Sequence, residues 1–261
     1  MEPESVREPL GAEGGEAPPP ARNFFSRLGG VYTSPKEAFA EIGRAPRLLV
    51  PILVAVILGL GSAWYVTQKV DMQASMEAQL EEAVAQGRIT AEQMEQQLAL
   101  MSNVAGKGTV VMGGISTLLL CLVIAGFMKL FSLIAGAENR FKPLLAVSLY
   151  ATIAVSIVTT VLMAVILQFK QPGEVSAADL RSVIVSNLGS LLDGVLEPGT
   201  LPKFVMGLAQ GIDIFNIWMI ALLAIGAAAV SRKLKTSTAA LWLGCSYAVI
   251  ILATAAIGSL W

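Results

Sequence analysis

The stretch LLVPILVAVILGLGSAWYVTQ, residues 48–68, holds 21 consecutive residues without a charged side chain. A helix needs about 20 apolar residues to cross a hydrocarbon core of about 30 Å. Pro51 falls in the first turn of the predicted helix, where the missing N–H breaks no helical hydrogen bond. Trp64 and Tyr65 stand near the other end, where aromatic side chains anchor a helix at the membrane surface. The stretch therefore predicts a membrane-spanning helix.

Composition extends this prediction to the whole chain. Its 261 residues are 55% hydrophobic and 14% charged, whereas charged residues make up about 25% of an average soluble domain. We therefore predict an all-α polytopic membrane protein, a bundle of five transmembrane helices with an extramembrane helical hairpin and interfacial helices. The predicted spans cover residues 48–68, 108–128, 144–169, 210–231 and 236–260.

The N-terminal segment has a different character from the rest of the chain. Residues 1–22 contain five glutamates, five prolines and three glycines, a composition typical of a disordered tail because it offers little to bury. Residues 23–261 then form one membrane domain. Ser34 as N-cap, a proline after it and Glu37 closing a capping box predict a short juxtamembrane helix over residues 34–45, lying on the headgroup surface.

Residues 69–107 carry a helical pattern that is too polar to cross a membrane, with six acidic and three basic side chains. Gly87 interrupts the pattern, and Thr90 with Gln93 offers a capping box for a second helix. We predict an outer helical hairpin over these residues. An apolar stripe at every fourth position either packs inside the hairpin or binds a partner, and it consists of Met72, Met76, Leu80 and Val84.

A second outer segment, residues 177–196, is predicted to be an interfacial helix that begins after the N-cap Ser176. Its apolar residues fall on one helical face, so the helix would lie along the outer interface without crossing it. These residues are Leu180, Ile184, Leu188, Leu191 and Val195.

The distribution of basic residues sets the predicted orientation. With the N-terminus inside, the inner segments carry 12 of the 18 Lys and Arg residues. Short cytoplasmic loops are enriched in Lys and Arg. We therefore expect a multi-pass protein of the plasma membrane with a cytoplasmic N-terminus and an external C-terminus. Lys129 falls on the inner side as an end charge that reaches the membrane surface.

The fourth predicted helix, which we expect to run continuously over residues 203–231, contains an acid. Gln210, Asp213 and Asn216 recur every third residue as one polar stripe, while Trp218 points elsewhere. An ionisable group beside hydrocarbon is costly unless it faces protein or water. A helix of this length, at about 1.5 Å per residue, overshoots the hydrocarbon core on the outer side and places the acid near the outer boundary.

The polar stripe needs a polar counterpart, and the third span offers one. Ser148, Thr152, Ser156 and Thr159 share one helical face. Three interpretations stay open: a hydrogen-bond network between the two helices, a water-filled or ion-conducting path along it, or a carboxylate that simply touches water. A GxxxG pattern at residues 207–211 likewise indicates either packing within the chain or dimerisation.

Several classes of chemistry are missing from the sequence. The chain has no histidine, which excludes histidine bases and metal ligands. Cys121 and Cys245 lie inside apolar runs, as small buried hydrophobes do. The sequence shows no phosphate-binding loop, acid dyad or nucleophile elbow. We therefore predict a protein that is not an enzyme, with no catalytic residue, no cofactor and no metal site.

Three short motifs, together with the order of the spans, carry a resemblance. They are SPKEAF at residues 34–39 before the first span, FKPLLAV at 141–147 opening the third, and DIFNIW at 213–218 in the fourth. Over about residues 24–261 the chain resembles the Yip (Ypt/Rab-interacting protein) domain family of multi-pass membrane proteins. The hairpin at 69–107 and the Ala/Gly-rich composition look more like the bacterial branch.

The resemblance implies a role in the membrane. Eukaryotic members act in vesicle traffic and bind prenylated Rab-type GTPases, whereas roles in the bacterial branch are mostly unassigned. Our first hypothesis is a non-enzymatic protein that binds or organises membrane lipids or a membrane or cytoplasmic protein partner, with self-association as an alternative and no nucleic acid. The second is a small transporter or channel that uses the stripe of Gln210, Asp213 and Asn216.

Overall fold

The computed structural model describes residues 23–70, 72–102, 107–137, 139–170, 180, 184–197 and 200–259. Within these ranges the chain is helical, and the only strand-like pairing is one isolated bridge. Four of the described helices are long and apolar enough to cross a membrane. The predicted all-α, polytopic class is therefore confirmed. The four helices are α3 (Leu49–Lys69), α6 (Lys107–Ile134), α7 (Phe141–Gln168) and α12 (Thr236–Ser259).

The fourth predicted span is not one helix, so the expected continuity over residues 203–231 is wrong. It consists of α10 (Lys203–Gly211) and α11 (Ile214–Ala229), separated by two residues with extended backbone. α11 is apolar but has only 16 residues, which span about 24 Å and fall short of a hydrocarbon core of about 30 Å. The described residues thus confirm four spanning helices and leave the fifth divided.

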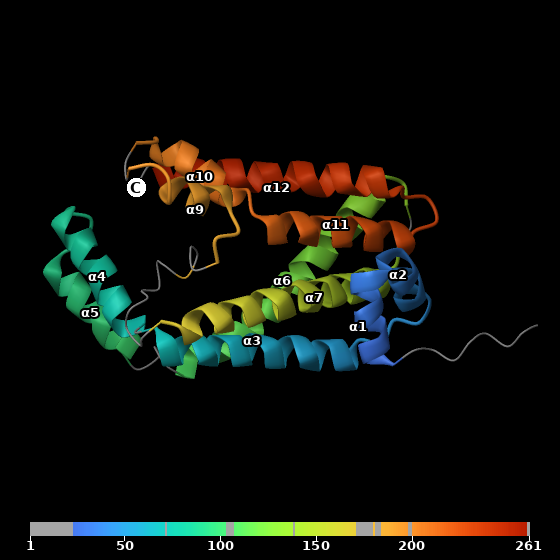
Figure 1. The fold of residues 1–261 in the computed structure, drawn as a ribbon, viewed down its shortest axis with the longest axis horizontal. Helices are drawn as coiled ribbons and strands as arrows, with labels where there is room; N and C mark the ends of the chain where they lie inside the picture. Colours follow the sequence, from blue (N-terminus) through green and yellow to red (C-terminus); the bar gives the residue numbers. More distant parts are fainter. Residues whose placement is uncertain are drawn as a thin grey trace, which may run out of the picture.

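Both parts of the divided helix pack along α12 (Figure 1). A side chain at Gly207 would meet Ala255, and one at Gly211 would meet Ile251, both on α12. The small residues of the GxxxG pattern therefore let α10 approach α12 closely. Packing within the chain is the role that the structure gives this pattern.

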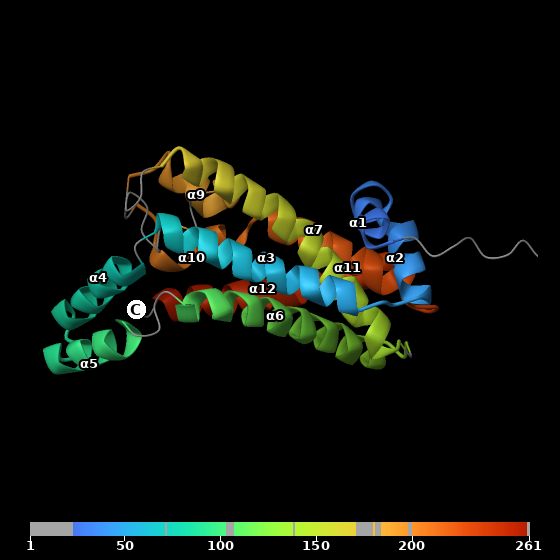
Figure 2. The same cartoon turned by 90° about the horizontal axis from the view of Figure 1, so that it is seen from below.

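α3, α6 and α7 form the other part of the bundle (Figures 1 and 2). At the crossing of α3 and α6, a Cβ atom on Gly59 would lie 2.5 Å from the carbonyl oxygen of Gly113. Only glycine on both helices allows the two backbones to come this close. α7 is the central helix of the core, because it packs against α3, α6 and α11 and its residues 144–155 are all buried.

Two short helices close one end of the bundle, α1 (Phe24–Thr33) and α2 (Pro35–Arg44). The sequence predicted α2 but not α1. Phe39 and Ile42 of α2 are completely buried, because the helix packs against α7 and α11. The expectation that its apolar face rests on lipid headgroups is therefore wrong. Ser34 also makes no side-chain capping bond, so the predicted capping box does not form.

The predicted helical hairpin is present as α4 (Met72–Ala85) and α5 (Ala91–Ser102), and it lies beyond the end of α3 and α6 that is away from α1 and α2 (Figures 1 and 2). Its capping box forms in both directions: the Gln93 N–H donates to Thr90 Oγ1 at 3.2 Å, and the Thr90 N–H donates to Gln93 Oε1 at 2.9 Å. Gly87 has a φ of +67° in the turn, a conformation that suits glycine. α4 and α5 pack on each other.

The predicted interfacial helix over residues 177–196 is interrupted within the described residues. Leu180 and α9 (Leu188–Asp193) are helical, whereas residues 184–187 and 194–196 are not. The helix starts late because the Asn187 side chain caps it, accepting a hydrogen bond of 2.8 Å from the Ser190 N–H. The expected N-cap Ser176 lies outside the described residues. α9 packs against α10.

Candidate functional site

Asp213, the acid inside the predicted span, is the N-cap of α11. Its backbone is extended, with φ −121° and ψ 135°. One carboxylate oxygen accepts hydrogen bonds from the N–H groups of Phe215, at 2.8 Å, and Asn216, at 3.1 Å. The negative charge also faces the positive end of the helix dipole. The residue thus starts a helix, which is why the longer helix breaks at this point.

A distant segment satisfies the remaining polar groups of the break. The Leu188 N–H donates to the Ile212 carbonyl at 2.9 Å, and the Ile214 N–H donates to the Ser186 carbonyl at 3.1 Å. The Ser186 hydroxyl also donates to the second carboxylate oxygen of Asp213. Unpaired backbone groups are expensive in a membrane. The segment before α9 therefore stabilises the interruption between α10 and α11.

The break lies level with the middle of α12. The Tyr247 hydroxyl donates a hydrogen bond of 2.9 Å to the Gly211 carbonyl, and Tyr247 is the twelfth of the 24 residues of α12. The expected position of Asp213 near the outer boundary assumed one helix that overshoots the core. Because α10 instead runs beside the C-terminal half of α12, the acid lies beside the middle of α12.

The predicted polar stripe does not exist as one helical face, because the helix breaks inside it. Gln210 is exposed, and its side chain lies against the position of Gly189 on α9. Asn216 is exposed on α11. Trp218 is half-buried and packs against Tyr32 of α1, with ring centroids 6.0 Å apart.

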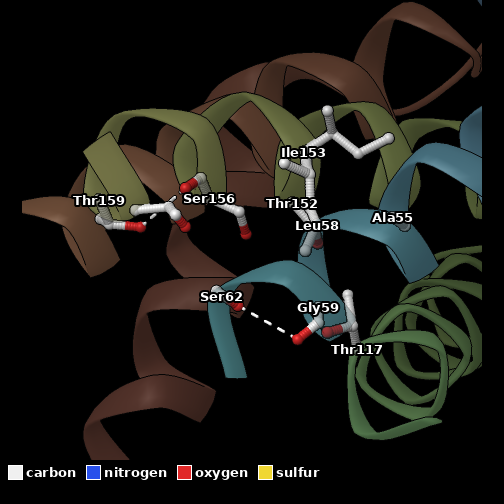
Figure 3. Close-up of a pocket in the computed structure, with 10 residues that line it drawn as sticks. Ala55, Leu58, Gly59, Ser62, Thr117, Thr152, Ile153, Ser156 and Thr159 are labelled. Carbon is white, nitrogen blue, oxygen red and sulfur yellow. Dashed lines mark hydrogen bonds between the residues drawn. The ribbon is translucent and has the colours of Figure 1, made fainter. Parts of the chain in front are cut away.

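The predicted counterpart on α7 faces other helices. Ser148 is completely buried and donates a hydrogen bond of 2.9 Å to the Cys121 carbonyl on α6. Thr152 and Ser156 point toward α3 (Figure 3). Among the described residues no hydrogen bond is found between these three and Asp213 or its neighbours, so the structure does not favour the first of the three interpretations, a network between the third and fourth spans. The candidate residues form two separate groups. One lies at the break and contains Gln210, Asp213 and Asn216, and the other lies on α7 and contains Ser148, Thr152 and Ser156.

Thr152 and Ser156 of the α7 group line a pocket of about 210 Å³ between α3, α6 and α7. Figure 3 shows α7 side chains pointing across this space toward α3. No charged side chain lines the pocket in the described part of the chain. Six of its ten lining residues carry a hydroxyl, and they are Ser62, Thr117, Thr152, Ser156, Thr159 and Thr160.

Thr152 is exceptional among these residues. The hydroxyls of Ser62, Thr117 and Thr159 donate to carbonyls of their own helices, at 3.2, 2.9 and 3.1 Å. Thr152 is only 3% exposed, and its hydroxyl has no hydrogen-bond partner among the described residues. The Cys121 thiol on α6, a weak hydrogen-bonding group, lies near it. A buried unpaired hydroxyl costs about 1–3 kcal/mol.

Sequence reasoning found the α7 side of the pocket and missed the opposite side. Ser62 and Thr117 were not singled out because neither belongs to a polar stripe along its own helix. A signal available in the sequence was their position inside predicted spans.

A buried ion pair between α1 and α2 was also missed. Arg27 of α1 is 1% exposed, and its Nε lies 3.2 Å from a carboxylate oxygen of Glu41 on α2. Its Nη1 donates to the Ala45 carbonyl at 2.9 Å. Nothing in the sequence distinguishes this arginine from the other basic residues near the first span. The pair joins α1 to α2.

The described residues contain no group of three or more potential metal ligands. The fold and the two polar groups define a polytopic helical membrane protein with a neutral polar pocket inside its bundle.

The chain belongs to the Yip1 domain family, whose model matches residues 29–257. This confirms the resemblance over nearly the whole membrane domain. Neither the curated proteins nor the solved structures contain a match to the chain.

Proposed function

We propose that this protein is a non-enzymatic member of the Yip1 family that binds or organises lipids or protein partners in the membrane. One observation carries the proposal: the pocket between α3, α6 and α7 offers hydroxyls and no ionisable side chain among the described residues. Such a surface can bind a ligand by hydrogen bonds. It lacks the general acid, base or activated nucleophile that catalysis requires.

The charge distribution supports a cytoplasmic N-terminus in the plasma membrane. α1 and the C-terminal end of α12 lie at opposite ends of the bundle (Figure 1). The end that holds α1 and α2 is basic, which favours the cytoplasmic side and its anionic lipids. Described cations at this end are Lys36, Arg44, Arg47, Lys129, Arg140, Lys142, Arg232, Lys233 and Lys235.

A partner-binding role is tested by photocrosslinking in the native membrane, followed by identification of the crosslinked molecules. We expect a defined protein or lipid partner and a trafficking-like role, by resemblance to the family. In parallel, the purified protein is placed in sealed vesicles and the movement of ions and small solutes is measured. Flux above that of protein-free vesicles would contradict the proposal.

The break at Asp213 favours a second candidate, a small transporter or channel. Broken helices at mid-depth are a recurring feature of transporter sites. Gln210, Asp213 and Asn216 would line its path, with the carboxylate as the charged group. The Asp213→Asn variant separates the two candidates in vesicles. If the wild type conducts and this variant does not, the second candidate replaces the first.

A further inference from the structure

The pocket between α3, α6 and α7 has a buried floor and a half-exposed mouth. Ala55, Gly59 and Thr152 form part of the floor and are buried, whereas Ser62 and Thr160 are half-exposed. On α3 the lining residues fall within positions 55–62, the middle third of a helix that is long enough to cross a membrane. The pocket therefore lies at mid-depth of the bundle.

The chemistry of the lining restricts the ligand. A phosphate or ammonium headgroup placed at this depth would need an opposite charge, and the lining offers none among the described residues. A purely hydrocarbon ligand would leave the Thr152 hydroxyl without a partner. An uncharged group with its own hydrogen-bonding atoms satisfies both conditions.

The size of the pocket is compatible with a small headgroup. Its volume of about 210 Å³ equals roughly seven water molecules at about 30 Å³ each. This is enough for a group of the size of glycerol but not for long acyl chains. The chains would have to leave through the half-exposed mouth.

Thr152 supplies an independent sign that something occupies the pocket. Its side chain lines the pocket and is 97% buried, yet its hydroxyl has no partner among the described residues. Buried polar groups in proteins are almost always hydrogen-bonded. The nearby Cys121 thiol is only a weak partner, so a molecule inside the pocket would supply the strong one once the side chain turns toward it.

We infer that the pocket binds the uncharged, hydroxyl-bearing head of a neutral lipid, with the Thr152 hydroxyl as its hydrogen-bond partner. This inference rests on the proposed binding function and names its ligand class. Two sources share the chemistry, a diacylglycerol and a long-chain alcohol. Both lack the charge that keeps phospholipid headgroups at the membrane surface.

The test uses the full chain in phosphatidylcholine vesicles with photoactivatable lipids. Three probes carry the same photoreactive group in an acyl or alkyl chain: a diacylglycerol, a long-chain isoprenoid alcohol and phosphatidylcholine. Crosslinked peptides are mapped by mass spectrometry, and unlabelled lipid competes in a titration. We expect labelling beside the pocket, on α3 and α7, by the diacylglycerol or the alcohol. The probe that labels more strongly identifies which of the two lipid classes binds.

A matched pair of variants tests the role of the hydroxyl. Thr152→Val keeps the shape of the side chain, and loss of one hydrogen bond should weaken competition by about fivefold to tenfold. Thr254→Val is the control, because Thr254 is exposed on α12 and its hydroxyl bonds to the Ile250 carbonyl of its own helix. The thermal unfolding temperature of Thr152→Val in lipid-free detergent should not be lower than that of the wild type, because no strong protein hydrogen bond is lost.

Three results would overturn the inference. They are labelling by phosphatidylcholine equal to that by the neutral lipids, no labelling beside the pocket by either neutral lipid, and unchanged competition in Thr152→Val. Ser156→Leu, which fills the pocket, must also abolish labelling there. Partner crosslinking in the native membrane does not depend on this pocket, so it can succeed when the neutral-lipid test fails.

Discussion

The hydroxyl of Tyr32 donates a hydrogen bond of 2.7 Å to the carbonyl of Ala154, and it joins residues 122 positions apart in the chain. The contact connects α1 to the middle of α7. The Tyr32 ring also packs against Trp218 on α11. Burial raises the pKa of Tyr32, so the phenol stays protonated and remains a donor. One side chain thus connects the N-terminal helix to two helices of the bundle.

Tyr32→Phe should lower the free energy of unfolding by about 0.5–1.5 kcal/mol, the usual net value of one hydrogen bond. Tyr32→Ala should cost more, because it also removes the ring that contacts Trp218. Both values are measured by thermal unfolding in detergent, followed by tryptophan fluorescence. Equal stabilities for the wild type and both variants would show that α1 is not anchored through this residue.

Glu41→Gln should destabilise the protein more than Arg27→Met does. The first change leaves the charge of Arg27 buried without its carboxylate partner, at a cost of about 1.5–3 kcal/mol. The second leaves a carboxylate whose side chain is 26% exposed and still reaches water. Glu37→Gln is the control, because Glu37 is exposed on the same helix. The free energies of unfolding are measured by chemical unfolding, and a larger loss for Arg27→Met than for Glu41→Gln would contradict this account.

Gly59→Ala should weaken the contact of α3 with α6. The added methyl group would lie 2.5 Å from the Gly113 carbonyl oxygen, and overpacking of this kind costs about 1–3 kcal/mol. Gly61→Ala on the same helix is the matched control, because a Cβ atom there meets nothing within 4 Å. Helix propensity alone would stabilise both variants, so an equal change of thermal stability in both would contradict a specific clash at Gly59.

Asp213→Ala should destabilise the start of α11 by about 1–2 kcal/mol through loss of its N-cap. Asp213→Asn should lose less of the free energy of unfolding than Asp213→Ala, because asparagine is also a preferred N-cap residue. The two variants are compared by thermal unfolding in detergent. If Asn costs as much as Ala, the negative charge itself and not the capping geometry stabilises the break.

Single cysteines test the proposed orientation. Gln86→Cys lies in the turn between α4 and α5, and Lys233→Cys lies between α11 and α12, and both positions are exposed. A maleimide that cannot cross membranes should label Gln86→Cys in intact cells, and Lys233→Cys only after the cells are opened. Labelling of the wild type measures the contribution of the native cysteines, Cys121 and Cys245. The reverse pattern would invert the topology.

The spans and the hairpin could be predicted from the sequence because their causes are local. A run of about 20 apolar residues is helical in lipid whatever surrounds it, since its backbone must pair with itself. The capping box of Thr90 and Gln93 likewise lies within four residues of chain. α1 was missed because its burial depends on Glu41 and Ala154, which are contacts far along the chain.

The candidate site could be predicted only in part. Thr152 and Ser156 share a helical face that the sequence shows, but the partners of that face come from α3 and α6. The pairing of α7 with the Asp213 stripe was wrong because a helical wheel assumes an unbroken helix. No pattern on one helix identifies which neighbour it faces.

The sequence by itself determined the class of the protein, the positions of the apolar helices and the charge asymmetry of the two ends, because hydrophobicity and charge add up residue by residue. Only the tertiary structure decided that Asp213 ends one helix and starts another, since its capping bonds are completed by Ser186 and Leu188 from a distant segment. It also decided that Thr152 is buried without a partner. Both outcomes depend on which segments meet in space, and that is set by packing between helices.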